Sequence, residues 1–339
     1  MNFEILEIEC CEYLGEFEDE YVYDIEMNDP SHTFIANNIL VHNSIYTSYE
    51  PLLKSIQGYE QMTTEIKRDI IVTINKEYLD KHNREFMEEY YETRHCRDMV
   101  HEFELETVAL SGVWLNVKKR YSQLLLWKDG KTYELDNLPM KTKGLEIAKA
   151  SYPTVARKCL QHMIRFLLND AGENFLLQRL NIEMMKQKEI FMNTQLEDIC
   201  GNMKVNGYTK YILDDTDEDG LVVADKCPSN VRALGTYNWF RNVYNLPGDP
   251  IYGGKLKWYC WTNGVVRKKG KKNPKFENVK YFAFQSGSYP KWADQYAPVN
   301  RCVMYEKMLL DPFNRIIESA GIGKLYSDGA LQSSLFDFI

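Results

Sequence analysis

Residues 1–43 carry eleven acidic side chains and no Lys or Arg, which restricts what this part of the 339-residue chain can form. The rest of the chain holds the other 38 acidic residues and all 41 basic ones, so a net charge of −11 is followed by one of +3. This acidic head has few large apolar side chains, and so short a segment rarely buries a stable core alone. We therefore expect the head to need a partner, and its charge favours a basic one.

Apolar spacing and turn residues predict a multidomain α+β chain. Isoleucines recur every four residues from Ile66 to Ile74, which is typical of one face of a helix. The expected strands are Tyr21–Met27, Thr33–Ala36, Ile39–Val41 and Ser44–Tyr49, followed by Phe103–Leu110 and Val113–Trp127 of a meander. Tight turns are expected between these last two strands, at Ser111-Gly112, and after them, at Asp129-Gly130. The expected helices are Thr63–Thr93, a helical region from Ser151-Tyr152-Pro153 to Cys200, and Val303–Ala320; residues 205–295 are expected to be mixed.

Composition points to a globular cytoplasmic protein. Hydrophobic residues make up 44% of the chain, and no apolar run is long enough to span a membrane. The acidic start does not resemble a signal peptide, which needs basic residues and an apolar stretch. The eight cysteines include no C-x-x-C and no Cys/His cluster, so we expect free thiols and no zinc site.

The end of the head, "VYDIEM" followed by "SHTFIANNILVHN" and then Ser, resembles the C-terminal signature of inteins, the self-excising protein elements. The resemblance implies a small all-β Hint fold over 1–43. The Asn43 side-chain amide can attack its own backbone carbonyl and cut the 43–44 peptide bond, helped by a large effective molarity. The resemblance implies that the Ser44 hydroxyl takes an acyl group from an upstream segment. His42 and His32 would move protons, and Asp24 would help to activate Ser44.

Two of these assignments have simpler alternatives. His32 is also explained as a residue that satisfies a turn, and Asp24 as a solvated charge at a strand end. The Cys or Ser that starts splicing in inteins is not found ahead of this intein-like block. Cys10 and Cys11 precede the block, but they follow an initiating Met rather than a foreign sequence. We therefore predict a second polypeptide that carries the intein N-half.

The stretch "VWLNVKKRYSQLLLW" is the most informative part of the body. If it is a strand, Lys119 and Tyr121 point to one face and Lys118 and Arg120 to the other. A cation beside an aromatic hydroxyl suits a phosphate backbone or a groove edge. A basic strand that is simply solvated is the alternative interpretation.

Five ordered stretches resemble the family B DNA polymerases, of the T-even bacteriophage type. The stretches are "SIYTSYEP", "ELETVALSGVWLNVKKRY", "MKTKGLE" with "SYPTVARKCL", "KCPSNVRALGTYN" and "SLFDFI". The resemblance implies that 44–150 is the last part of a palm, built as a β-meander with a helix, and that 151–330 is a mostly helical thumb. It also implies that Ser44 completes an Asp-Thr-Asp-Ser turn whose aspartates, on the other polypeptide, hold Mg²⁺.

The resemblance assigns DNA contacts to several residues. Lys119 and Tyr121 would grip the primer–template, while Lys118, Lys141 and Arg232 would contact the duplex. Glu106 would lie near the metal site. A strand-face charge is the alternative for Glu106, and a structural ion pair is the alternative for Arg232. The basic run 267–275 is either a phosphate-contacting loop or a solvated one.

The tail, residues 331–339, resembles the peptides with which polymerases bind sliding clamps. It offers a polar hook and an apolar plug for a pocket on the clamp. The alternative is a terminus that folds onto its own thumb. The expected clamp-binding residues are Gln332, Leu335, Phe336, Phe338 and Ile339.

Together these features predict the C-terminal precursor of a phage DNA polymerase, joined to its N-terminal fragment by cofactor-independent trans-splicing at Asn43/Ser44. The spliced product would extend a primer with dNTPs and Mg²⁺ in the host cytoplasm, and its partners would be that fragment, primer–template DNA and a sliding clamp. One alternative is an unspliced DNA- and clamp-binding subunit that uses the head for dimerisation. Another is a Hint-type autoprocessing protein with the body as cargo.

Overall fold

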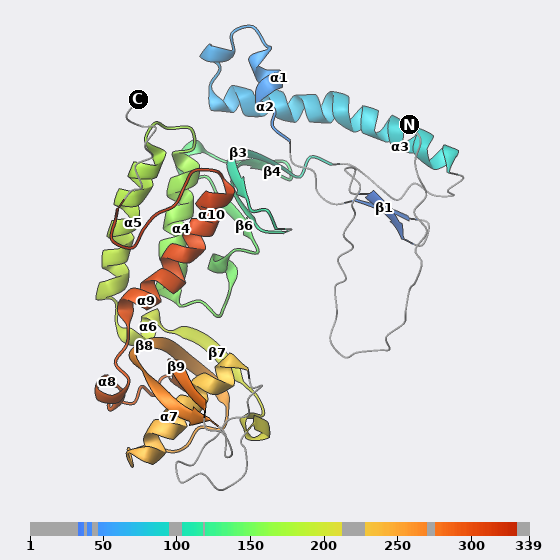
Figure 1. Ribbon diagram of the computed structural model, residues 1–339. Coiled ribbons are helices and arrows are strands. Elements are labelled where there is room, and N and C mark those ends of the chain that lie inside the picture. Colours follow the sequence, from blue (N-terminus) through green and yellow to red (C-terminus); the bar gives the residue numbers. More distant parts are fainter. Residues whose placement is uncertain are drawn as a thin grey trace. The chain divides into compact units, whose positions relative to one another are not determined.

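The protein is described by a computed structural model, which covers residues 33–36, 39–42, 47–94, 104–117, 119–211, 228–269 and 275–330 (Figure 1). The chain forms two compact units, Met1–Leu105 and Glu106–Ile339. The division lies between Leu105 and Glu106, whereas the sequence placed domain boundaries at 43/44, 150/151 and 330/331. The described residues are mixed α+β, as the sequence predicted.

The first unit contains the predicted hairpin of the head. β1 (Thr33–Ala36) pairs antiparallel with β2 (Ile39–His42), in a register that places Thr33 opposite His42. Both strands were expected from their alternating apolar residues, and β2 extends one residue further than predicted. The expected strand Tyr21–Met27 lies outside the described residues.

A long helix dominates the rest of this unit and confirms the prediction for Thr63–Thr93. It comprises α2 (Thr64–Ile74), a π-helical turn (Asn75–Leu79) and α3 (Asp80–Thr93). The Thr63 hydroxyl caps its start by accepting from the Ile66 N–H. At the π turn, the Asn75 side chain donates to the Ile71 carbonyl and accepts from the Tyr49 hydroxyl at 3.0 Å.

The expected strand Ser44–Tyr49 is wrong in its described part. Residues 47–49 have no regular structure, and the chain enters a short helix, α1 (Glu50–Lys54), immediately after them. Pro51 lies in the first turn of α1, where its fixed φ favours a helix start. Residues 44–46 are outside the described part of the chain.

The second unit begins with an antiparallel sheet. β3 (Thr107–Trp114) pairs with β4 (Tyr121–Lys128), which also pairs with β5 (Lys131–Thr132) and β6 (Met140–Lys143). The predicted turn at Asp129-Gly130 is confirmed, because both residues have positive φ, 46° and 84°, as a tight hairpin turn of this kind requires.

The other predicted turn, at Ser111-Gly112, is wrong. Both residues lie inside β3, and the chain reverses over residues 115–120 instead. Ser111 donates its hydroxyl proton to the Leu168 carbonyl at 2.7 Å, and the Trp114 indole lies where a Cβ on Gly112 would be. These two small residues therefore allow close packing within a strand rather than a reversal.

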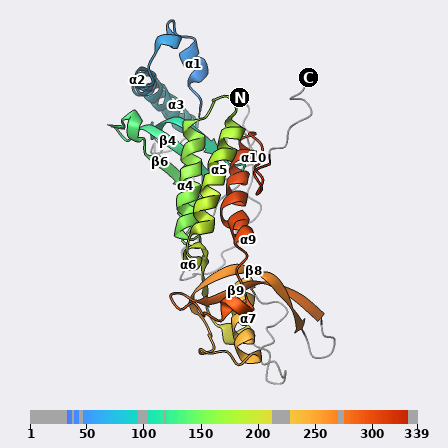
Figure 2. The same ribbon diagram turned by 90° about the vertical axis from the view of Figure 1, so that its left-hand side faces the viewer.

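Helices pack against this sheet (Figure 2). α4 (Thr154–Asn169) contacts β3, β4, α5 (Leu176–Asn193) and α10 (Asp311–Ser319). Its apolar face, which includes Leu160, Met163 and Ile164, is fully buried. The helical region from Pro153 to Cys200 and the C-terminal helix are confirmed; α6 (Leu196–Ile199) ends the first, and α9 (Arg301–Tyr305) and a π turn (Glu306–Leu310) begin the second.

A three-stranded antiparallel sheet lies between these helical segments in the sequence. Its order is β7 (Gly201–Val205), β8 (Gly254–Lys269) and β9 (Lys275–Gln285), and α7 (Ser229–Val243) packs on β7 and β9 (Figure 1). Phe240 of α7 contacts the rings of Trp261 and Phe282. The short helix α8 (Ala293–Tyr296) adds Trp292 and Tyr296 to this aromatic cluster. Helices predominate in the segment expected to be a mostly helical thumb, but the sequence did not predict this sheet.

Candidate nucleic-acid interface

The residues predicted for splicing lie almost entirely outside the described part of the chain. His42 is the last residue of β2. Asp24, His32, Asn43 and Ser44 fall on residues that the structure does not describe. Their roles therefore remain predictions from the sequence.

The predicted DNA-contacting residues Lys119 and Tyr121 lie where the chain reverses between β3 and β4. Tyr121 is the first residue of β4, is 8% exposed, and lies opposite Trp114 of β3. Lys119 is not on the strand: it is exposed in the turn over residues 115–120, with a φ of 60°. The prediction that Lys119 and Tyr121 share a strand face is thus wrong, because the chain reverses before Tyr121. Lys118 is outside the described residues.

Lys141 and Glu106, which the sequence assigned to different roles, pair with each other. Lys141 Nζ donates to Glu106 Oε1 at 2.5 Å, from β6 to the residue that precedes β3. Burial by itself would lower the pKa of Lys141, but the hydrogen bond to Glu106 and the neighbouring Tyr121 raise it overall. The Glu106 carboxylate and the Lys141 ammonium group, which lies beside the Tyr121 phenol, thus form one small polar cluster that joins the start of β3 to β6 across β4.

A second polar cluster, which the sequence reasoning missed, centres on Glu146. This carboxylate is 5% exposed and accepts two bonds from Arg120 Nη2, at 2.8 and 3.0 Å. Lys149 Nζ and Arg315 Nη2 each donate to its Oε1 at 3.2 Å. Burial would raise the pKa of the Glu146 carboxyl, but its own backbone N–H, Arg120 and Lys149 together hold its pKa below 4.5.

The Glu146 cluster had only a partial signal in the sequence. Glu146 and Lys149 are three residues apart, which suggests a local pair, and Glu146 stands in the stretch "MKTKGLE" that also contains Lys141. Nothing in the spacing relates Glu146 to Arg315, 169 residues away. Only the packing of α10 near the sheet brings these two side chains together.

The remaining predicted contacts are dispersed. Arg232 is exposed on α7, and no carboxylate among the described residues forms an ion pair with it. The basic run 267–275 begins at the end of β8 and continues to the start of β9, and residues 270–274 are not described. The five residues predicted to bind a clamp, Gln332, Leu335, Phe336, Phe338 and Ile339, are also outside the described residues.

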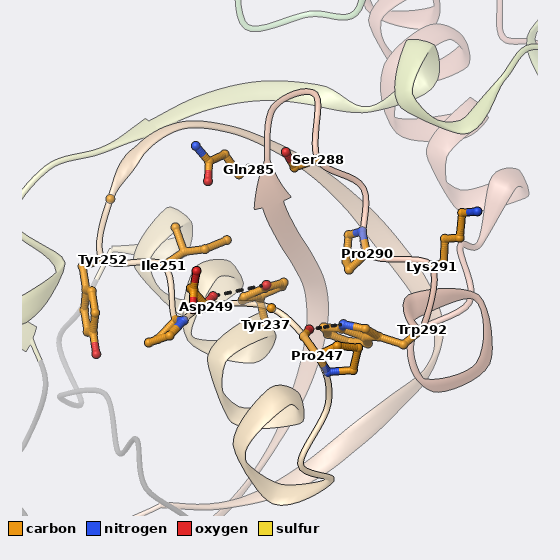
Figure 3. A pocket seen from close by; sticks show the side chains of 13 residues that line it. Tyr237, Pro247, Asp249, Ile251, Tyr252, Gln285, Ser288, Pro290, Lys291 and Trp292 are labelled. Carbon is orange, nitrogen blue, oxygen red and sulfur yellow. Dashed lines mark hydrogen bonds between the residues drawn. The ribbon is translucent and has the colours of Figure 1, made fainter.

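A cavity of about 520 Å³ lies beside the second sheet, where no predicted site residue is found (Figure 3). Two of its polar aromatic groups have partners: Trp292 Nε1 donates to the Pro247 carbonyl at 3.1 Å, and the Tyr237 hydroxyl donates to the Asp249 carbonyl at 3.3 Å. Gln285 and Lys291, which are exposed, are among the other lining residues. These two hydrogen bonds attach residues 247 and 249 of the loop to the residue before α8 and to α7.

In the described ranges, no three His, Cys, Asp or Glu side chains gather closely enough to hold a metal ion. Glu106 pairs with Lys141, and its predicted place near a metal site held by the partner fragment stays a prediction. None of the described helices is long and apolar enough to cross a membrane.

A scan against models of protein families and a search of curated proteins found no match to this chain.

Proposed function

We propose that the chain is the C-terminal precursor of a family B DNA polymerase, with an intein C-half over 1–43 and the end of the palm and the thumb from Ser44 onward. One observation carries the proposal for the body. Two of the stretches quoted from the sequence, "ELETVALSGVWLNVKKRY" and "MKTKGLE", contact each other through two ion pairs beside the first sheet. Glu106 of "LETVA" pairs with Lys141 of "MKTKGLE", and Arg120 of "KKRY" pairs with Glu146 of "MKTKGLE".

The cations of this region give it the chemistry of a surface that follows a nucleic-acid backbone. Lys119 is exposed in the turn, and Lys141 lies beside Tyr121 two strands away from β3. Cations supply most of the affinity for a duplex through phosphate contacts, and an aromatic hydroxyl supplies a hydrogen bond that helps to fix register. In the proposed reaction the metal-binding aspartates belong to the partner fragment, so this chain alone has no polymerase activity.

Trans-splicing is tested by mixing the purified chain with its candidate N-half and following intact masses. The expected result is the loss of residues 1–43 and a longer product joined at Ser44. Asn43→Ala should abolish this product, because Asn43 supplies the amide that closes the succinimide. Asn38→Ala, in the same head, is the matched control and should still splice. Two unchanged masses in a stable complex would contradict the proposal and favour the unspliced binding subunit.

DNA binding by the body is tested separately, by fluorescence anisotropy of a labelled primer–template duplex. The affinity should fall steeply with salt, and Lys119→Ala should reduce the slope of log K against log salt by about 0.9, the value for one lost phosphate contact. A slope identical to that of the wild-type chain would remove Lys119 from the interface.

A further inference from the structure

The turn that carries Lys119 is fixed from two sides. Within the turn, the Leu115 N–H donates to the Arg120 carbonyl at 3.0 Å. From outside the turn, Arg120 Nε donates to the carbonyl of Gly144, at the end of β6, at 3.1 Å. The backbone around Lys119 is therefore tied to a neighbouring strand end, although Lys119 itself has the positive φ of 60° that a lysine seldom adopts.

Gly144 allows this close approach. It has a φ of +68°, and a Cβ at this position would lie 2.3 Å from the Lys119 carbonyl oxygen and 2.9 Å from Arg120 Cγ. The nearer contact is with backbone, which cannot move aside as the end of a flexible side chain can. A side chain at position 144 would thus push the turn away from β6.

Glu146 holds the same turn through Arg120. Both bonds from Arg120 Nη2 reach this buried carboxylate, whose other partners are Lys149 next to it and Arg315 on α10. The guanidinium is thereby oriented inward, against the body of the unit. Lys119, the preceding residue, is exposed.

We propose that Gly144 and Glu146 are positioning residues that hold the β3–β4 turn in the one conformation that presents Lys119 to a nucleic-acid backbone. This inference rests on the proposed DNA-binding function of the body. It assigns no contact with DNA to either residue, since both act through Lys119 and Arg120.

The first experiment is a double-mutant cycle in duplex binding, with the full chain and a labelled primer–template duplex. Lys119→Ala and Gly144→Ala should each weaken binding roughly tenfold at 0.1 M salt, the effect of losing one phosphate contact, and each should lower the salt slope by about 0.9. The double variant should bind no more weakly than either single variant, because both remove the same contact. Additive losses would overturn the proposal, since a merely destabilising glycine substitution would act independently of Lys119.

The matched control is Gly130→Ala, in the next turn of the same sheet. Gly130 also has a positive φ, +84°, but a Cβ there meets nothing within 4 Å. Gly130→Ala therefore imposes the same kind of backbone strain without displacing the Lys119 turn. It should leave both the duplex affinity and the salt slope unchanged.

A second experiment does not depend on DNA. Trypsin cleaves after Lys and Arg, and a turn that is released from β6 becomes a substrate between residues 118 and 121. Under conditions where cleavage follows the population of the open form, Gly144→Ala should be cut there at least about tenfold faster than the wild type and Gly130→Ala. Equal cleavage of the three proteins would overturn the proposal that Gly144 allows the turn to be held against β6. Faster cleavage in a chain that does not bind duplex would overturn the nucleic-acid role and locate the failure in the proposed function.

Discussion

Glu146→Gln removes one negative charge from a buried position and changes the side-chain shape very little. In the wild-type chain this carboxylate accepts four hydrogen bonds, two from Arg120 and one each from Lys149 and Arg315. It connects the end of the first sheet with α10, so its loss should be measurable as a change in the free energy of unfolding.

The size of this change in the free energy of unfolding depends on how well water can solvate each cation once the carboxylate is gone. Lys149 and Arg315 are each 47% exposed and lose little, whereas Arg120 is 22% exposed and its two bonds form a charged pair with a buried acceptor. Hydrogen bonds to charged groups are each worth about 1.5–3 kcal/mol, and breaking a fully buried pair costs about 3–5 kcal/mol. Because Arg120 is only partly buried, we expect a loss of about 3 kcal/mol at pH 7.

Tryptophan fluorescence is a suitable assay because all six tryptophans lie within the unit Glu106–Ile339. Urea unfolding should show a lower midpoint for Glu146→Gln with an unchanged slope. The control is Glu318→Gln on α10, whose carboxylate faces Lys324 at 3.8 Å on the surface. This exposed pair should contribute less than about 1 kcal/mol.

The pH dependence tests the cause of the effect. The pKa of Glu146 is lowered on folding, so its ionised form stabilises the folded protein fully above the unfolded-state pKa near 4.5. That contribution is lost as the pH falls through the lower, folded-state pKa. The difference in stability between wild type and Glu146→Gln should therefore be constant near neutral pH and shrink below about pH 4.5. A difference under 1 kcal/mol at pH 7, or one that does not shrink in acid, would refute this reasoning.

Three further predictions concern other parts of the second unit. Asn314→Ala should lower the free energy of unfolding by about 2–4 kcal/mol, measured by the same urea titration, because the buried Asn314 bonds both the N–H and the carbonyl of Leu325 at 2.9 Å. Iodoacetamide at pH 8 should label the exposed Cys302 well before Cys159 and Cys200, since burial raises the pKa of those two thiols to about 11 and 12; equal labelling in a peptide map would contradict the packing. Glu106→Gln should tighten duplex binding severalfold at low salt, measured by anisotropy, because it removes a negative charge near the phosphates and releases Lys141. Weaker binding would contradict the inference that the ion pair with Glu106 keeps Lys141 from the phosphates.

Sequence periodicity predicted the elements whose signals are local. The helix from Thr63 to Thr93 follows from isoleucines at four-residue spacing. The hairpin turn at Asp129-Gly130 follows from the preference of these residues for positive φ. The strands Thr33–Ala36 and Ile39–His42 follow from alternation.

The errors occurred where long-range contacts outweigh local preferences. Ser111-Gly112 has the composition of a turn, but Ser111 bonds the carbonyl of Leu168 in α4, and this packing keeps the pair within β3. Lys119 was expected on a strand because it stands in the run "VWLNVKKRYSQLLLW", two residues before Tyr121. The chain reverses there because Arg120 is held by Gly144 and Glu146.

By itself the sequence determined the acidic character of residues 1–43, the chemistry available at Asn43 and Ser44, and the main helices, since these depend on residue type and short-range spacing. Only the tertiary structure decided that Glu106 forms an ion pair with Lys141. The same holds for the ion pairs of Glu146, whose partners are Arg120, Lys149 and Arg315. The physical reason is that an ion pair depends on distance in space. The residues of these pairs are from 3 to 169 positions apart in the chain, and packing of the helices on the sheet sets the longest of these separations.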